Sequence, residues 1–101
     1  MQFFVDSADL QAIKDLADTG MVDGVTTNPS LVAKSGQDFK TLIAEICDLV
    51  PGPVSAEVTA LDAEAMLSEA DELLAIAENV PIKVPLTWDG LKATRQLADR
   101  G

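Results

Sequence analysis

Two patterns of apolar and polar positions alternate along the chain. Short apolar runs end beside polar residues, as buried strands do. Between these runs, apolar residues recur three or four positions apart, which is the spacing of one face of a helix. The pattern predicts a fully buried strand over Phe3–Val5, a short buried strand within Val80–Thr87, and two further strands over Val22–Thr27 and Val54–Val58.

Capping residues mark where the helices between these strands begin. Asn28 followed by proline is a strong start signal, Asp62 and Thr87 suit two later helices, and either Ser7 or Asp9 can cap the first. Glu and Asp residues fill the face of the Asp62 helix opposite its apolar stripe, which is typical of a solvated surface. The helix positions expected to face the core are Leu10, Ile13, Leu16, Ala17, Leu31, Val32, Phe39, Leu42, Ile43, Ile46, Cys47, Val50, Met66, Leu67, Ala70, Leu73, Leu74, Ala77, Leu91 and Leu97.

The resulting order of elements places the chain in the α/β class. Four strand–helix units in succession predict a parallel sheet with right-handed crossovers. A length of 101 residues is that of a single domain, over residues 1–101. A flavodoxin-like open sheet has similar repeats, but it needs a phosphate loop after the first strand, and the stretch Asp6–Asp9 is a poor one.

Composition and charge exclude several classes of partner. The formal net charge is −10, from 17 acidic and 7 basic residues, so the surface repels nucleic acid and anionic membranes. No apolar run approaches the ~20 residues of a membrane span, and Met1–Asp6 lacks the basic region of a signal peptide, so we expect a cytoplasmic protein. The single cysteine, Cys47, excludes an internal disulfide, and the absence of histidine argues against a transition-metal site.

Lys83 stands in the middle of the apolar run that forms the fourth strand. An apolar site disfavours the ammonium form, which lowers the pKa of a lysine and frees its amine to act as a nucleophile. Nearby carboxylates would act in the opposite direction. A lysine on an edge strand also blocks aggregation, and this stretch alone leaves both interpretations open.

Polar residues also lie in, or at the end of, each of the other three predicted strands. Because parallel strands point the same way, their carboxyl ends meet along one rim, where one amine, two carboxylates and several hydroxyl or amide groups converge. In the third strand the alternation places Ser55 and Glu57 on the same face. Imine chemistry on a carbonyl substrate needs such a set: a nucleophilic amine, an acid/base, and donors for sugar hydroxyls.

Four strings in these strands resemble the transaldolase family. They are Phe3-Phe4-Val5-Asp6-Ser7-Ala8-Asp9, Asp23-Gly24-Val25-Thr26-Thr27-Asn28-Pro29-Ser30-Leu31, Val54-Ser55-Ala56-Glu57-Val58 and Ile82-Lys83-Val84-Pro85. The resemblance is to the short members of the family, which include fructose-6-phosphate aldolase, and it covers essentially the whole chain.

The resemblance implies half of a (β/α)₈ TIM barrel and class I aldol chemistry on a sugar phosphate, without a metal or other cofactor. By this resemblance Lys83 is the Schiff-base lysine, Asp6 the acid/base aspartate and Glu57 the glutamate that works through a water. The residues that it implies for the substrate pocket are Thr26, Asn28 and Ser55.

Family chains are about twice as long, and strands five to eight, with their phosphate-binding arginine and serines, have no counterpart in these residues. The sequence leaves open a fragment, a natural half-length protein and an engineered half barrel. It also leaves open two functions: an aldol enzyme or its N-terminal half, and a catalytically silent half-barrel module. Because a half barrel has two unpaired edges and an uncovered inner face, we expect a homodimer or a higher homo-oligomer.

Overall fold

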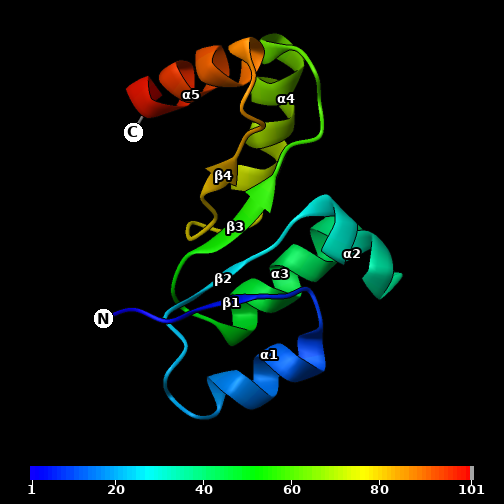
Figure 1. The fold of residues 1–101 in the computed structure, drawn as a ribbon, viewed down its shortest axis with the longest axis vertical. Helices are drawn as coiled ribbons and strands as arrows, with labels where there is room; N and C mark the ends of the chain where they lie inside the picture. The colour runs from blue at the N-terminus through cyan, green and yellow to red at the C-terminus, as the bar shows by residue number, and fades with distance from the viewer. Residues whose placement is uncertain (101) are drawn as a thin grey trace.

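The computed structural model describes residues 1–100, which form one parallel sheet and five helices (Figure 1). The elements in chain order are β1 (Phe4–Asp6), α1 (Leu10–Ala17), β2 (Gly24–Thr26), α2 (Pro29–Ser35), α3 (Phe39–Leu49), β3 (Val54–Glu57), α4 (Ala63–Leu74), β4 (Ile82–Lys83) and α5 (Trp88–Arg100). Within this part of the chain, no helix is long and apolar enough to cross a membrane.

The sheet has the order β1-β2-β3-β4, and every neighbouring pair is parallel. Its register places Asp6 beside Thr26, Thr26 beside Ser55, and Glu57 beside Lys83. The sheet does not close, so that β1 and β4 are its two edges among residues 1–100. This arrangement confirms the predicted α/β class and is that of half a TIM barrel.

The helices bury one face of the sheet, which we call the outer face. In β3, Val54 and Ala56 are fully buried, whereas Ser55 and Glu57 on the other face are only half-buried, which confirms the predicted alternation. Figure 1 shows α1, α2 and α3 gathered around β1 and β2, and α4 and α5 packed together beside β3 and β4. The helix α3 contributes Leu42 and Ile46 to one hydrophobic cluster and Ile43 to the other.

Side-chain caps hold the helix starts that the sequence predicts. Asp9 accepts hydrogen bonds from the Gln11 and Ala12 N–H groups, and of the two residues proposed for this end it is the cap. Asn28, Asp62 and Thr87 accept from the backbone N–H three residues later, at 3.0, 2.9 and 3.0 Å. These bonds satisfy amide donors that the first helical turn leaves without a partner.

The two edge strands are less buried than the sequence predicts. Phe4 in β1 is 47% exposed, because its ring lies against Gly24 on the inner face, which nothing covers in residues 1–100. The fourth strand is reduced to Ile82–Lys83, since it has a neighbour on one side only. The predicted full burial of Phe3–Val5 was therefore wrong, and the short strand predicted within Val80–Thr87 is present but only partly buried.

Some helix positions also face outward against expectation. Leu91 is 51% exposed, because α5 packs through Gly90 and Ala93, which are both buried. Any side chain at Gly90 would collide with the Pro85 carbonyl, so that the close approach requires glycine. Leucines near the helix C-termini are likewise exposed, at Leu16 and Leu74.

Candidate active site

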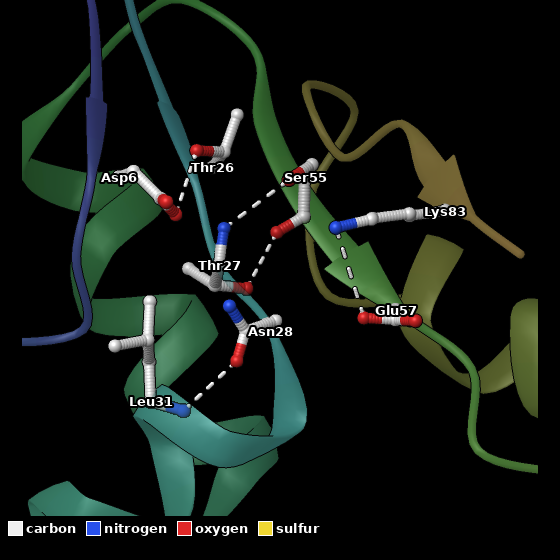
Figure 2. Close-up of polar contacts among 8 residues, drawn as sticks. All are labelled: Asp6, Thr26, Thr27, Asn28, Leu31, Ser55, Glu57 and Lys83. Carbon is white, nitrogen blue, oxygen red and sulfur yellow. Dashed lines mark hydrogen bonds and ion pairs between the residues drawn. The ribbon is translucent and has the colours of Figure 1, made fainter. Parts of the chain in front are cut away.

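The residues that the sequence selects lie along the inner face of the sheet and its carboxyl rim (Figure 2). At the β1 edge, the Thr26 hydroxyl donates a hydrogen bond of 3.1 Å to the Asp6 carboxylate. Neighbouring residues of parallel strands on one face can make such a contact directly. The bond orients a carboxylate that is otherwise exposed, on the side from which a substrate can approach.

Ser55 is held from the strand beside it. The Thr27 N–H donates to the Ser55 hydroxyl at 3.2 Å, and the Thr27 hydroxyl donates to the Ser55 carbonyl at 2.7 Å. Thr27 is fully buried, and its two bonds join the end of β2 to β3. Thr27 is thus a structural residue of the site that our selection missed, although its position between Thr26 and Asn28 is a signal.

Asn28 has a structural role that uses only part of its side chain. Its carbonyl oxygen caps α2 by accepting the Leu31 N–H at 3.0 Å. The NH₂ group keeps its donors, and Figure 2 shows it pointing back toward Thr27 and the inner face. An asparagine at this place can therefore start a helix and donate to a ligand at once.

The amine of the site lies at the opposite edge. Lys83 Nζ is 3.8 Å from Glu57 Oε2, which makes a long ion pair between β3 and β4. The Lys83 side chain is 53% exposed and that of Glu57 is 22% exposed. Lys83 is therefore not in an apolar site in residues 1–100, because β4 is an edge strand whose inner face is uncovered.

The six predicted residues therefore form three local groups: Asp6 with Thr26, Ser55 with the nearby Asn28 turn, and Glu57 with Lys83. In Figure 2 the side chains of Asp6 and Lys83 point toward the middle of this row from opposite edges. An unprotonated amine on a face that also presents two carboxylates can attack a carbonyl and exchange protons with its surroundings. Among residues 1–100, no three His, Cys, Asp or Glu side chains converge as metal ligands.

One carboxylate near the site was misread as surface. Glu69 in α4 belongs to the face predicted to be solvated, yet it accepts hydrogen bonds from Thr59 and Ala60, directly after β3. The helical spacing places Glu69 at the border of the apolar stripe, three residues after Met66 and four before Leu73, and the path of the β3–α4 loop brings its bonding partners to it.

Nearly the whole chain matches one protein family. Residues 3–101 match the family described as Transaldolase/Fructose-6-phosphate aldolase. The match includes every residue of the candidate site, from Asp6 to Lys83.

Individual relatives agree with this match. The chain is 64% identical over 101 residues to a probable transaldolase of Ruegeria sp. (strain TM1040) and 63% identical to one of Roseobacter denitrificans (strain ATCC 33942 / OCh 114). It is also 64% identical to a probable transaldolase of Rhodospirillum centenum (strain ATCC 51521 / SW). Each alignment covers 100% of this chain but only 46%, 46% and 44% of those proteins, so the chain spans about half the length of the relatives it matches.

Proposed function

The chain belongs to the transaldolase/fructose-6-phosphate aldolase family, and on this premise we propose that it carries the imine-forming half of a class I aldol site. The substrate is a ketose phosphate, and the reaction is the transfer or cleavage of its three-carbon ketone portion. No cofactor takes part. The cytoplasmic location expected from the sequence stays a prediction.

Lys83 begins the reaction as the nucleophile. Its amine adds to the C2 carbonyl of the ketose, and loss of water leaves a protonated imine. Asp6 then takes the proton of the C4 hydroxyl while the C3–C4 bond breaks, so that an aldehyde leaves and an enamine stays on Lys83. The enamine adds to an acceptor aldehyde, or is protonated, and hydrolysis of the imine releases the product.

The other residues assist these steps. Glu57, next to the amine, moves protons through a water during imine formation and hydrolysis. Thr26, Asn28 and Ser55 offer hydroxyl and amide groups to the sugar hydroxyls. The observation that carries the proposal is the 3.8 Å pairing of Lys83 with Glu57 on the face that also presents Asp6.

Reductive trapping tests the first step. Incubation with dihydroxyacetone and borohydride should convert the imine into a stable secondary amine, which mass spectrometry locates on Lys83. Lys83→Ala should lose the adduct, whereas Lys34→Ala, which removes an exposed lysine of α2, should keep it. Absence of an adduct on Lys83 in the unaltered chain rules out imine formation by this protein.

A second function competes with this one. The amine and Asp6 are exposed in residues 1–100, so that water is not excluded from the site. This exposure favours a catalytically silent half barrel that serves as a structural or assembly module. Turnover of fructose 6-phosphate that Lys83→Ala abolishes supports the enzyme, and absence of turnover in both chains supports the module.

Our proposal also includes self-association. Two copies related by a two-fold axis can place β4 of each beside β1 of the other, which brings Lys83 of one edge near Asp6 of the opposing edge. Beside β4, a groove of about 660 Å³ lined by Val80, Ile82, Val84 and Leu97 offers apolar surface to a partner. The net charge of −10 opposes association, but a Debye length of ~8 Å at physiological salt weakens that repulsion.

Sedimentation at micromolar concentration tests this arrangement, together with hydrogen exchange of the edge strands. Association should slow exchange in both β1 and β4. A monodisperse monomer whose edge strands exchange quickly contradicts the proposed self-association and leaves the imine chemistry to be judged by trapping.

A further inference from the structure

A single carboxylate on α4 gathers three donors from the loop after β3. Glu69 Oε1 accepts the Thr59 N–H at 2.9 Å and the Thr59 hydroxyl at 3.1 Å, and Oε2 accepts the Ala60 N–H at 3.0 Å. Hydrogen bonds to an ionised acceptor are shorter and stronger than those between neutral groups. Both oxygens of Glu69 are therefore engaged on two consecutive residues.

The geometry of α4 explains how this contact arises. Helical side chains lean toward the N-terminus of their helix, so that a residue in the second turn covers the segment leading into the first. The helix does not need Glu69 as a cap, because Asp62 already accepts the Ala65 N–H at 2.9 Å. The Glu69 bonds thus serve the loop and not the helix.

The loop that Glu69 holds begins where the site ends. The Val58 N–H donates to the Lys83 carbonyl at 3.0 Å and joins β3 to the neighbouring strand one residue after Glu57. Thr59, the next residue, is the first that Glu69 binds. The end of β3 is thus fixed on one side by the sheet and on the other by α4.

Glu57 itself has little else to hold it. In residues 1–100 its carboxylate makes the 3.8 Å ion pair with Lys83 and no hydrogen bond accompanies that pair. Glu57, Thr59 and Glu69 line one cavity of about 370 Å³ between α2 and the β3–α4 loop. The backbone of Glu57 is held by the bonds of Ala56 and Val58 to β4 and its surroundings, at 3.1 and 3.0 Å, and the Glu69 bonds to Thr59 are the next constraint beyond them.

We propose that Glu69 is a positioning residue: by holding Thr59 and Ala60 it sets the end of β3 and, through it, the distance from the Glu57 carboxylate to the Lys83 amine. The inference rests on the proposed function for the role of Glu57. By this proposal α4 influences the site through Glu69, although no residue of that helix lies on the inner face of the sheet.

Hydrogen exchange tests the first part of this proposal without any need for catalysis. Glu69→Gln keeps the shape of the side chain, but its NH₂ group cannot accept, so that one of the two amides loses its acceptor. We expect exchange of the Thr59 or Ala60 amide to accelerate about tenfold or more. Glu72→Gln is the matched control, because it removes the same charge from the same helix at an exposed ion pair with Lys40.

The second test asks whether Glu69 acts through Glu57. The rate of dihydroxyacetone trapping on Lys83 is measured in the unaltered chain, in Glu69→Gln, in Glu57→Gln and in the double variant. Glu69→Gln should slow trapping about tenfold, less than the ~10²-fold expected from removing a general acid/base. In the Glu57→Gln background it should have no further effect, because the two residues act on the same step.

The outcomes separate this inference from the proposed function. A chain that gives no Lys83 adduct overturns the proposed function and, with it, the catalytic meaning of Glu69. An adduct that forms equally fast in Glu69→Gln, or effects that simply add in the double variant, overturns the positioning role alone. Unchanged exchange at both Thr59 and Ala60 also overturns it.

Discussion

The two faces of the same sheet differ in almost every physical respect. On the outer face, Val54 and Ala56 are fully buried beneath the helices. On the inner face of the same strand, Ser55 and Glu57 are half-buried and carry groups that can react or donate. A strand of four residues thus serves both stability and chemistry, because successive side chains point to opposite faces.

The difference between the faces determines which substitutions each of them tolerates. The outer face is stabilised by the area removed from water, so that size and shape matter there. Apart from Phe4, the inner face presents mainly polar groups that pair with each other, and their identity matters more than their volume. Thr27 and Glu69 connect the two faces at the rim. Thr27 bonds the end of β2 to β3, and Glu69 bonds the loop after β3 to α4.

The largest expected effect is a loss of stability on the outer side. Leu42 in α3 is fully buried in the cluster beneath β1 and β2, and Leu42→Ala should lower the free energy of unfolding by about 2–5 kcal/mol. Lys83→Ala, a half-exposed inner-face change, should alter it by no more than about 0.5 kcal/mol. Urea denaturation measures the free energy of unfolding of both variants. Similar losses in Leu42→Ala and Lys83→Ala would contradict the expected difference between the two faces.

Much of this division could be predicted from the sequence. The helix periodicity found the buried positions of α3 and α4, and the alternation in β3 separated Ser55 and Glu57 from their apolar neighbours. These patterns report which face of an element is buried whatever the element packs against. The helix starts followed from capping chemistry, which is local to a few residues.

The remaining features depend on neighbours that local patterns do not specify. Phe4 and Lys83 belong to apolar runs, but each lies on an edge strand and is about half exposed. Leu91 has helical spacing, but Ala93 takes the place in the cluster with α4, and Gly90 lies against the Pro85 carbonyl. Glu69 lies at the border of the apolar stripe of α4, and only the path of the β3–α4 loop brings Thr59 and Ala60 to its carboxylate.

A second, smaller effect concerns Asn28, which caps the helix α2 with its oxygen and presents its NH₂ group toward the inner face. Asn28→Ala removes the cap of α2 and should cost about 1 kcal/mol in stability. Asn28→Asp keeps an accepting oxygen and should retain most of that stability, but it loses the NH₂ donors. Denaturation together with fructose 6-phosphate turnover separates the two roles. Equal loss of stability in both variants would show that the cap oxygen is not what Asn28 supplies.

The smallest expected effect is a pH dependence of stability that comes from Cys47, on the helical side of the sheet. Cys47 in α3 packs against both hydrophobic clusters, and burial, aided by the negative charge of Asp48, raises the pKa of its thiol. The neutral thiol is the form that suits an apolar contact, whereas in the unfolded chain the thiol ionises near its ordinary pKa of about 8.5.

The sign of the effect follows from proton binding. Above pH ~8.5 the folded chain keeps the Cys47 proton more tightly than the unfolded chain, so that stability falls as pH rises from there through the raised folded pKa. Below that range the contribution is fully present and constant. Denaturation of the unaltered chain and of Cys47→Ala between neutral and alkaline pH should therefore show a steeper decline in stability for the unaltered chain.

Alkylation by iodoacetamide at pH ~8 should likewise be slower in the folded chain than in urea, because only the thiolate reacts. Equal alkylation rates in the two states would place Cys47 in water, and the boundary between the two clusters would then be open to solvent.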